Sequence, residues 1–534
     1  MRPFSGAAGA FCACRHTLSE RGLVLEQQER ILNVLTYLKR IVSVVPDKTA
    51  FTDGVQSLTF RELDDRVRRI GTYLHKNAVY KRPVVVFMRK SPAEVSAFFG
   101  IVCGGCFYVP VDEEMPHDRI QLILENVRAP LIICDADTAA LAERFDAMGG
   151  QVVQYDALLQ TQPDDAALAE IECRAIDTDP IYIVFTSGST GVPKGVAACH
   201  RSVIDYIEQL SAVLGFDRDT VFGNQAPLYF DACLKELYPT LKFGATTYLI
   251  PKTLFAQPVP LVEYLNEHRI NTICWVVSAL TMVSAFGTFD VVRPKHLRTV
   301  AFGSEVFPTK QFNLWREAAP DASFTNLYGP TEGTGMCCYY HADRSFAEGE
   351  PIPIGQPFRN REILLLKEDG SSAQPGEEGE ICIRGTAVTL GYYNDPQRTA
   401  QAFVQNPQNT AYPELIYKTG DIARYNERGE LVFVSRRDYQ IKHMGHRIEL
   451  GEIEAAANRT PGVRMAACIY DAEKRKLVLF YVGEAADRAL HAALKERLPR
   501  YMTPNKLVRL PALPQTANGK LDRVRLQKIW KESK

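Results

Sequence analysis

Phe185-Thr-Ser-Gly-Ser-Thr-Gly-Val-Pro-Lys-Gly195 continues directly from the apolar run Ile181–Phe185, which is rich in residues that favour strands. This order predicts a loop that leaves a buried strand. The glycines of the loop allow close backbone approach, its Ser and Thr hydroxyls can donate hydrogen bonds, and Lys194 adds a positive charge. These features suit a polyphosphate, and the alternative interpretation is a plain Gly/Ser-rich surface loop. The Walker A pattern of P-loop enzymes is excluded, because Gly195 stands where that pattern needs Ser or Thr.

Strand and helix patterns alternate from about residue 47 onwards, on both sides of this loop. Ser57–Leu63 leads into a helix that continues through Leu74. Ser91–Glu94 has three features of a helix start, with Ser as N-cap, Pro in the first turn and Glu reaching back. A further helix is expected at Ile120–Val127, and strands are expected at Pro83–Met88, Cys106–Val111, Pro130–Cys134, Ile270–Val277 and Leu297–Phe302. The repeated βα units predict an α/β fold with a mostly parallel sheet and helices on its faces.

The last third of the chain predicts a β-rich subdomain and a small C-terminal domain. Around Gly376–Arg384 the pattern changes to short strands and turns. Beyond Tyr439 we expect an α+β unit, with helices at Glu449–Asn458 and Ala486–Leu498 and strands at Met465–Tyr470 and Lys476–Val482. The charged run Ser435–Tyr439 that precedes it is a candidate hinge. A chain of 534 residues exceeds a single core. We therefore expect a large N-terminal domain over 26–436, a hinge over 437–439 and a C-terminal domain over 440–534.

The first residues differ from the rest of the chain. Residues 1–25 show little periodicity and are too broken in their apolar part for a signal peptide, so we expect a disordered extension. An amphipathic pattern typical of a helix begins at Glu26. Its apolar positions are Ile31, Leu32, Leu35 and Leu38.

Composition limits the function classes. Apolar residues make up 46% and charged residues 23% of the chain, as in ordinary globular proteins, and the net charge of -1 does not favour a nucleic-acid or acidic-membrane partner. No apolar run approaches the roughly 18 residues that span a bilayer. The 13 cysteines lie mostly in apolar segments, which suits a reducing compartment such as the cytoplasm. Cys103 and Cys106 could form a redox or metal pair, but no second pair or His cluster accompanies them, which favours packing.

Three further motifs carry polar groups that could do chemistry. Asn326–Glu332 combines an aromatic residue, a tight turn, a hydroxyl and a carboxylate, Tyr417–Asp421 ends in an acid beside a glycine, and Asn518–Arg523 places Lys520 on a turn. Taken singly they are compatible with a packed turn, a helix cap and a solvated lysine. Taken together and in this order, they resemble the adenylate-forming superfamily. The most similar members are the amino-acid adenylation domains of nonribosomal peptide synthetases and the D-alanine–carrier-protein ligases.

The resemblance covers residues 27–530. Its other marks are Leu58–Leu63, Gly104–Asp112, Phe230–Cys233, Gly379–Gly385 with Gly391-Tyr392, Ser435–Gln440, Gly445–Glu454 and Leu498–Pro504. The resemblance implies that a carboxylate is joined to ATP, which gives an acyl-adenylate and pyrophosphate, and that the acyl group then passes to a thiol. It implies ATP and Mg²⁺ as cofactors, with Glu332 as the metal ligand.

The resemblance also assigns roles in nucleotide binding. Tyr328 matches the aromatic residue stacked on adenine, Asn326 the contact to the adenine amino group, and Asp421 the acceptor of the ribose hydroxyls. Arg436 matches a ribose and phosphate contact. The full set of expected nucleotide-binding residues is Thr186, Ser187, Gly188, Ser189, Thr190, Gly191, Lys194, Gly303, Ser304, Glu305, Asn326, Tyr328, Gly329, Thr331, Asp421, Arg436 and Lys520.

The catalytic residues implied are Lys520, Thr190 and Glu332. Lys520 matches the lysine that bridges the substrate carboxylate and the α-phosphate, where it would stabilise developing negative charge. Rotation of the C-terminal domain about Asp438, the hinge position of the family, would withdraw Lys520 and bring the Gly445–Glu454 side to the site. Ser435 departs from the family, which usually has glycine there.

The substrate is indicated by one residue above all. Asp231 matches the aspartate that binds the α-ammonium group in relatives that activate amino acids, and the alternative is a strand-end aspartate bound to the backbone. The other expected pocket residues are Ala232, Lys235, Cys274, Ala301, Gly303, Leu327, Gly335 and Met336. A buried lysine is costly unless it is paired. Lys235 could therefore meet an acidic side chain such as that of glutamate, or reach solvent and leave a small pocket for alanine.

The acceptor is expected to be a separate carrier protein with a phosphopantetheine thiol, or coenzyme A, because no carrier motif follows Arg523. The competing interpretations are a D-alanine–carrier-protein ligase, an acyl-CoA synthetase, and an inactive ATP-binding scaffold. Asp231 argues against the acyl-CoA synthetase. The inactive scaffold is disfavoured because the residues expected for catalysis and nucleotide binding are all present: Thr190, Lys194, Glu332, Asp421 and Lys520.

Overall fold

The computed structural model describes residues 31–148, 150–188, 191–437, 440–515 and 521–532. The fold described below lies in the unit Leu32–Lys534. The extension predicted over residues 1–25 lies outside the described residues. Among those that are described, no helix combines the length and the apolar character needed to cross a bilayer.

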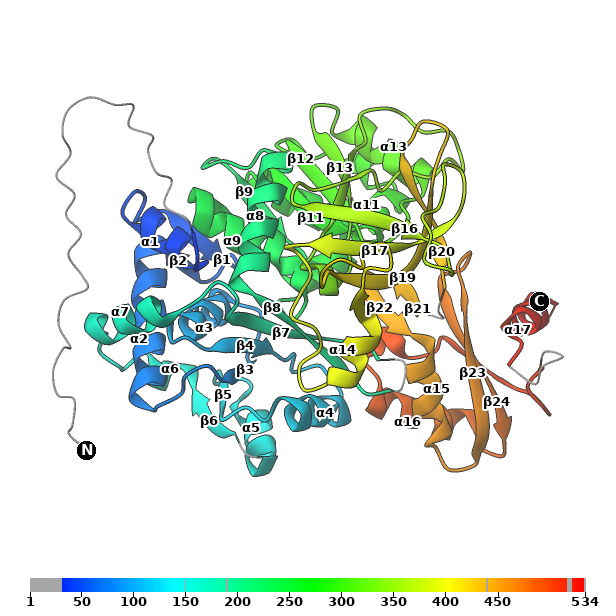
Figure 1. Cartoon of the computed structure of the whole chain (residues 1–534), viewed down its shortest axis with the longest axis horizontal. Helices are drawn as coiled ribbons and strands as arrows, with labels where there is room; N and C mark the ends of the chain where they lie inside the picture. Colours follow the sequence, from blue (N-terminus) through cyan, green and yellow to red (C-terminus); the bar gives the residue numbers. More distant parts are fainter. Residues whose placement is uncertain (1–30, 149, 189–190, 438–439, 516–520, 533–534) are drawn as a thin grey trace. The chain divides into compact units, whose positions relative to one another are not determined.

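The largest sheet has nine strands, and its central strands are parallel (Figure 1). Pairing from β13 through β1 is parallel, and the edge strands β2, β14 and β15 pair antiparallel. From one edge to the other the strands are β15 (Gln356–Pro357), β14 (Cys338–His341), β13 (Ser323–Tyr328), β12 (Thr299–Gly303), β11 (Thr272–Val276), β9 (Val221–Asn224), β10 (Thr246–Leu249), β1 (Thr49–Thr52) and β2 (Ser57–Thr59). The helices that precede or follow these strands in the chain are α1 (Thr36–Val42), α8 (His200–Leu214), α9 (Leu234–Phe243), α10 (Pro258–Glu267), α11 (Val277–Ala285), α12 (Thr288–Val291) and α13 (Thr309–Ala318).

A second sheet has six strands, five of them parallel. Its order is β6 (Gln151–Gln154), β5 (Leu131–Cys134), β3 (Pro83–Phe87), β4 (Phe107–Pro110), β7 (Pro180–Thr186) and β8 (Lys194–Cys199). The helices that precede or follow its strands in the chain are α2 (Phe60–Lys76), α3 (Pro92–Cys103), α4 (His117–Val127), α5 (Ala139–Ala142), α6 (Tyr155–Leu158) and α7 (Asp165–Arg174). The antiparallel pair β7–β8 is the hairpin that carries the glycine-rich loop.

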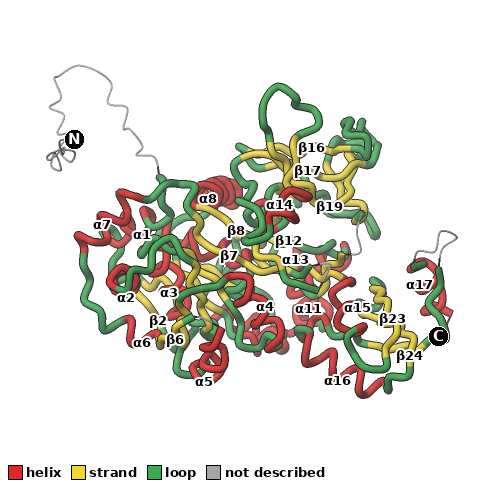
Figure 2. The backbone as a smooth tube through the Cα atoms, turned by 60° about the horizontal axis from the view of Figure 1, so that its bottom comes forward, coloured by secondary structure: helices red, strands yellow, loops and turns green. Residues whose placement is uncertain are grey.

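The rest of the chain forms smaller sheets. Around β16, β17 and β19, Figure 2 shows mostly strands and loops. This β-rich part contains β16 (Arg361–Leu366), β17 (Gly379–Gly385), β18 (Phe403–Gln405), β19 (Leu415–Tyr425), β20 (Leu431–Arg436) and α14 (Pro396–Ala402). The C-terminal part contains β21 (Gln440–His443), β22 (His446–Glu449), α15 (Leu450–Asn458), β23 (Val463–Asp471), β24 (Lys476–Gly483), α16 (Asp487–Arg497), β25 (Lys506–Arg509) and α17 (Arg523–Glu532).

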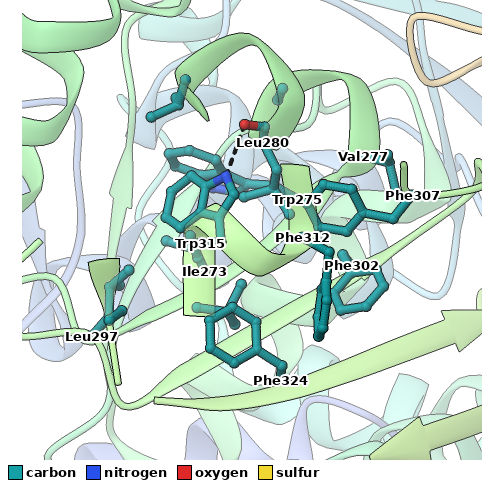
Figure 3. Close-up of a cluster of buried hydrophobic side chains, with 14 of the residues drawn as sticks. Ile273, Trp275, Val277, Leu280, Leu297, Phe302, Phe307, Phe312, Trp315 and Phe324 are labelled. Carbon is teal, nitrogen blue, oxygen red and sulfur yellow. Dashed lines mark hydrogen bonds between the residues drawn. The ribbon is translucent and has the colours of Figure 1, made fainter. Parts of the chain in front are cut away.

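An aromatic core holds the strands that lead to the cleft (Figure 3). Trp275 of β11 and Trp315 of α13 are fully buried, and the Trp315 indole Nε1 donates to the Leu280 carbonyl at 2.8 Å. Phe302 of β12 packs in the same cluster, edge-on to Phe307. Burial of each such ring stabilises the fold by roughly 1.5–3 kcal/mol. The carboxyl ends of β11 and β12 are thereby held in fixed register, and these ends lead into the cleft described below.

The structure confirms the α/β class and the predicted elements, and it corrects two local expectations. Ser91 caps α3 by accepting from the Glu94 amide at 3.2 Å, but Glu94 is buried and no return bond to the cap is formed. The capping box occurs instead at α2, between Thr59 and Glu62. The helical stripe predicted from Glu26 begins as helix only at Thr36 within the described residues, because the segment before it forms a turn.

Candidate active site

The glycine-rich loop joins two antiparallel strands. Thr186 and Lys194 are register partners at the ends of β7 and β8, so the glycine-rich segment connects two neighbouring antiparallel strands. A Cβ on Gly188 would lie 2.0 Å from the Val192 carbonyl oxygen, and Gly191 has a φ of +82°. Both positions therefore require glycine. Ser189 and Thr190 lie outside the described residues.

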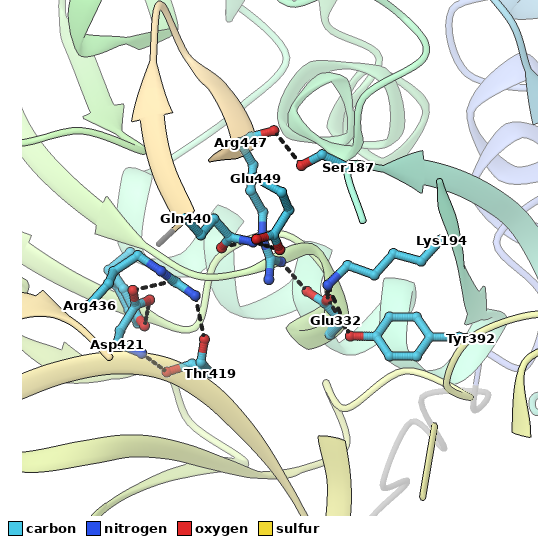
Figure 4. Close-up of polar contacts among 11 residues, drawn as sticks. Ser187, Lys194, Glu332, Tyr392, Thr419, Asp421, Arg436, Gln440, Arg447 and Glu449 are labelled. Atoms are coloured by element: carbon cyan, nitrogen blue, oxygen red, sulfur yellow. Dashed lines mark hydrogen bonds and ion pairs between the residues drawn. The ribbon is translucent and has the colours of Figure 1, made fainter. Parts of the chain in front are cut away.

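Glu332 is the centre of a polar cluster beside this hairpin (Figure 4). Its side chain is 0% exposed, and it lies on the short 3₁₀ turn Thr331–Gly333. The Tyr392 hydroxyl donates to Oε1 at 2.8 Å, Lys194 Nζ lies 3.5 Å from the same oxygen, and Arg447 Nη1 donates to Oε2 at 2.7 Å. Burial alone would raise the pKa of Glu332, but the charges of Arg447 and Lys194 outweigh it and hold the pKa well below its usual range. Glu332 is therefore an ionised carboxylate.

Arg447 reaches this cluster from the C-terminal part of the chain. Its backbone carbonyl accepts from the Ser187 hydroxyl at 2.8 Å, and its Nε donates to Gln440 Oε1 at 2.6 Å. In the same turn, the Gly445 amide donates to Glu305 Oε1 at 3.0 Å, and the other oxygen of Glu305 accepts from the Ser278 amide at 2.8 Å. The turn between β21 and β22 is thus fixed to the glycine-rich hairpin on one side and to the start of α11 on the other.

A second contact lies between α4 and the C-terminal part. Arg119 Nη1 donates to Glu452 Oε1 at 2.6 Å, and both side chains are only 5% exposed. Nearby, His446 stacks on Tyr501 with ring centroids 3.6 Å apart. Burial lowers the pKa of His446 to about 3, so the ring is neutral and packs as an aromatic group. The Arg119–Glu452 pair is buried and the His446–Tyr501 stack is half-buried, and both stabilise the arrangement in which the β21–β22 turn faces the hairpin.

Asp421 forms a compact polar group with its neighbours in sequence and in space. Its Oδ2 accepts from the Tyr328 hydroxyl at 2.6 Å, and its Oδ1 pairs with Arg436. Arg436 also donates to the Thr419 carbonyl at 3.1 Å. Lys442 Nζ lies over the Tyr328 ring at 5.5 Å from its centroid. The expected ribose acceptor and the expected adenine-stacking residue therefore lie together, and the C-terminal part covers one face of the ring.

One cleft contains many of the predicted residues. Its empty space is about 1060 Å³ including its opening to solvent. The predicted residues that line it are Thr186, Ser187, Asp231, Ala232, Lys235, Ser304, Gly329, Thr331, Gly335, Met336, Asp421 and Arg436. Burial raises the pKa of Asp231, and Lys235 and Thr331 act in the opposite direction.

Several of the predicted site residues do not line this cleft, and others lie outside the described residues. Among the described residues, Cys274, Ala301 and Leu327 are buried within β11, β12 and β13 and do not line the cleft. Asn326 is buried and donates its amide to the Pro353 carbonyl at 2.8 Å. The others that do not line the cleft are Gly188, Gly191, Lys194, Gly303, Glu305, Tyr328 and Glu332. Asp438 and Lys520 lie outside the described residues, like Ser189 and Thr190.

Sequence reasoning missed four residues of the site. Arg447 and Tyr392 fall within the quoted motifs Gly445–Glu454 and Gly391-Tyr392, but nothing in the sequence pairs them with Glu332. No motif in the sequence pointed to Lys442 or Arg119.

The residues present fit a divalent cation bound together with phosphates. A cation such as Mg²⁺ needs only one or two carboxylates when phosphates and water complete its shell. Glu332 supplies an ionised carboxylate, and among the described residues no group of three or more His, Cys, Asp and Glu side chains could hold a metal by itself. Any Mg²⁺ at this site would therefore depend on the phosphates of a bound nucleotide.

Sequence comparison assigns the chain to a family. The profile of the AMP-binding enzymes matches residues 38–393, and the profile of the AMP-binding enzyme C-terminal domain matches residues 452–520. The chain belongs to the AMP-binding enzyme family. The predicted class, an adenylate-forming ligase with a large α/β part and a small C-terminal part, is thereby confirmed.

Relatives of this AMP-binding enzyme include stand-alone ligases and multidomain synthases. It is 31% identical to a D-alanine–D-alanyl carrier protein ligase of Bacillus licheniformis, over 93% of this chain and 99% of the relative. It is 32% identical to an L-proline–[L-prolyl-carrier protein] ligase of Pseudomonas fluorescens, over 90% and 96%. It also matches tyrocidine synthase 3 of Brevibacillus parabrevis at 32% identity, over 92% of this chain but 8% of that protein.

A solved structure shares the fold. The adenylation domain AlmE of Vibrio cholerae, in complex with glycyl-adenosine-5'-phosphate, superposes with a TM-score of 0.80 at 22% identity, over 95% of this chain and 100% of that one.

Proposed function

We propose that the chain activates an amino acid with ATP as an aminoacyl-adenylate, releases pyrophosphate, and passes the aminoacyl group to the phosphopantetheine thiol of a separate carrier protein. The observation that carries this proposal is the position of Asp231, which lines one cleft with the glycine-rich hairpin and Thr331. A carboxylate there can hold the α-ammonium group while the substrate carboxylate faces the nucleotide. The full-length match to two stand-alone carrier-protein ligases supports a partner in trans.

The nucleotide would lie between the hairpin and the group around Asp421. The backbone amides of the hairpin and Lys194 would hold the departing phosphates, and Asp421 would accept from the ribose hydroxyls. Glu332 would bind Mg²⁺, which supplies charge neutralisation of the phosphates. Tyr392 and Lys194 hold the Glu332 carboxylate in place beside the hairpin.

The observed arrangement supports the second half-reaction. With Arg447 paired to Glu332, the carboxylate assigned to Mg²⁺ is already neutralised, and the β21–β22 turn occupies the approach to the hairpin. We infer that this arrangement follows the departure of pyrophosphate, and that in the first half-reaction the C-terminal domain, residues 440–534, rotates about a hinge at 437–439 that includes Asp438. Lys520 would then enter and stabilise charge between the substrate carboxylate and the α-phosphate.

The test is ATP–pyrophosphate exchange across the L- and D-amino acids. We expect exchange with at least one amino acid. We also expect that Lys520→Ala abolishes it while ATP still binds, because the lysine acts on developing charge and not on ground-state binding. Exchange near the wild-type rate in Lys520→Ala would contradict the role given to this residue.

An acyl-CoA synthetase is the competing enzymatic function. It predicts exchange with fatty or aryl acids and none with amino acids. Asp231 argues against it, because a carboxylate that lines the cleft would repel an acid that lacks an ammonium group. ATP binding without exchange for any carboxylic acid would instead favour an inactive scaffold.

A further inference from the structure

A second pocket lies apart from the cleft. It is lined by residues of α1, α2, α3 and α7, helices on the left side of Figure 1, and its empty space is about 970 Å³ including its opening to solvent. Pockets of this size hold small molecules in many proteins. Its wall is mostly apolar. The buried or half-buried side chains that form this wall are Leu35, Leu38, Val67, Val102, Leu168 and Ile171.

The pocket lies at the base of the glycine-rich hairpin. Pro180 begins β7 and His200 directly follows β8, and both residues line the pocket. Thr186 and Lys194 stand at the other ends of the same two strands. β7 has seven residues, and at about 3.3 Å per residue the two ends of the hairpin lie roughly 20 Å apart. Of the described residues, none lines both the pocket and the cleft, so a molecule in the pocket would leave the cleft free.

The charged groups at the pocket are already paired. Every lysine, arginine, aspartate and glutamate that lines it, among the described residues, takes part in an ion pair. These pairs are Lys39–Glu172, Arg68–Asp165, Arg68–Asp64 and Lys81–Asp179. The Cys103 thiol also lines the pocket, and burial raises its pKa to about 12, so it is neutral. A charged ligand would have to compete with these pairs and lose its own hydration, and the pocket therefore favours an uncharged molecule.

His200 presents a hydrogen-bond donor to the pocket. Its side chain is 4% exposed, and burial lowers its pKa to about 4, so the ring is neutral near pH 7. The Val34 amide donates to Nδ1 at 3.2 Å, which leaves the proton of the neutral ring on Nε2. Within the described part of the chain, no acceptor contacts Nε2. An N–H group that has left water without finding an acceptor is costly, and a ligand oxygen would remove that cost.

We propose that this pocket is a second binding site, for an uncharged and largely apolar small molecule that carries a hydrogen-bond acceptor such as a carbonyl oxygen. The apolar wall would cover the body of the molecule, and His200 Nε2 would donate to its acceptor. This ligand is neither the nucleotide nor the amino acid of the proposed function, because both of those are charged. The inference does not depend on that function.

The first test uses benzophenone as the probe. It is uncharged, has two apolar rings and one carbonyl oxygen, and forms covalent adducts with nearby C–H groups on irradiation. We expect irradiation of the full chain to label peptides of α3 or α7 saturably, as mapped by mass spectrometry. Saturating ATP and Mg²⁺ should leave this labelling unchanged, because the pocket and the cleft share no described residue.

Three competitors separate shape, hydrogen bonding and charge. 1,1-Diphenylethylene has the shape of benzophenone without its acceptor, and we expect it to protect the pocket from labelling about threefold or more weakly, as the loss of one neutral hydrogen bond predicts. The anion 4-benzoylbenzoate and the cation diphenylmethylammonium should protect less than benzophenone does, since each brings a charge to a pocket whose ion pairs are already complete.

Three variants test the residues. Ala169→Trp adds an indole to α7 at a position that lines the pocket, and we expect it to abolish labelling. Ala166→Trp makes the same change at an exposed position of α7 that does not line the pocket, and labelling should persist. His200→Asn keeps an acceptor for the Val34 amide but lacks the Nε2 donor, and we expect it to bind benzophenone no better than 1,1-diphenylethylene. Thermal unfolding shows whether each variant is folded.

Each outcome decides the inference. Saturable labelling of α3 or α7 that Ala169→Trp loses and Ala166→Trp keeps would establish the pocket as a binding site, and loss of the preference for the carbonyl probe in His200→Asn would establish the donor. Labelling that is confined to the cleft, or that never saturates, would overturn the proposal. Stronger protection by either charged competitor would overturn the assigned ligand class, and an unchanged preference in folded His200→Asn would overturn the role of His200.

Discussion

Substitution of Arg447 by methionine should separate the two half-reactions. The guanidinium donates to Glu332 at 2.7 Å, with side chains 17% and 0% exposed, and it links the C-terminal part to the hairpin region. Methionine keeps much of the aliphatic volume and removes the charge. The arrangement observed here should therefore lose the charge-assisted hydrogen bond to Glu332. The bond from Arg447 to Gln440 lies within the C-terminal part, so its loss is common to both arrangements and does not change their balance.

The free-energy cost of this substitution depends on the hydrogen-bond partners that Glu332 keeps. Stripping a buried carboxylate of its only partner costs about 3–5 kcal/mol. Glu332 retains the Tyr392 hydroxyl and the ammonium of Lys194, so the cost is closer to the roughly 1.5–3 kcal/mol of one hydrogen bond to a charged group. At about 1.4 kcal/mol for each factor of ten, the arrangement shown should become about 10- to 150-fold less favourable.

The assay measures each half-reaction alone. Transfer is followed in a single turnover from a synthetic aminoacyl-adenylate to pantetheine, and activation is followed by ATP–pyrophosphate exchange. For Arg447→Met we expect slower transfer, by up to the factor above, with exchange within about threefold of the wild type. Arg488→Met, which changes an exposed arginine of α16, is the control and should alter neither rate. An equal loss in both half-reactions, or unchanged transfer, would refute the reasoning.

Three further predictions address binding, pH and the hairpin. Asp231→Asn should raise the KM for the amino acid at least about tenfold more than the KM for ATP, measured by exchange, and equal changes would remove its ammonium role. Burial lowers the pKa of His200 from 6.5 to about 4, and Val34 donates to its unprotonated Nδ1. The unfolded chain therefore binds an extra proton between these values, and about 3 kcal/mol of stability should be lost as pH falls from 6.5 to 4. Urea unfolding should show this loss reduced in His200→Gln but not in His75→Gln, a change at an exposed position of α2, and equal slopes in all three proteins would contradict it. Gly188→Ala should weaken ATP binding by about tenfold or more in calorimetry, since its Cβ would meet a carbonyl, and normal affinity would show that the hairpin does not contact ATP.

The fold was predictable because local patterns determine most of its elements. Apolar runs such as Pro83–Phe87 are buried on both faces of the six-stranded sheet, and continuous hydrophobicity is what a parallel strand requires. The Ser91 cap and its proline likewise act within one turn. Glu94 failed as a capping residue because its position on α3 faces the interior, and tertiary packing overrode the local preference. The antiparallel return of the glycine-rich loop depends on a strand partner, which periodicity does not show.

The site was predictable in its residue types and not in its contacts. Glu332, Asp421 and Asp231 were found through motifs, because each acts through its own side chain. The pair Arg447–Glu332 spans 115 residues and Arg119–Glu452 spans 333, and both depend on how the C-terminal part lies against the rest. A sequence specifies the groups available to both half-reactions and does not show which of them meet in one arrangement.

The most direct test of the central claim is the fate of the substrate oxygen. An amino acid labelled with ¹⁸O in its α-carboxylate is incubated with the protein, ATP, Mg²⁺ and hydroxylamine as acceptor, and the nucleotide and phosphate products are analysed by mass spectrometry. Attack of the carboxylate on the α-phosphate predicts one ¹⁸O atom in AMP and none in pyrophosphate. Formation of ADP with ¹⁸O in inorganic phosphate, or AMP that carries no label, would contradict an aminoacyl-adenylate.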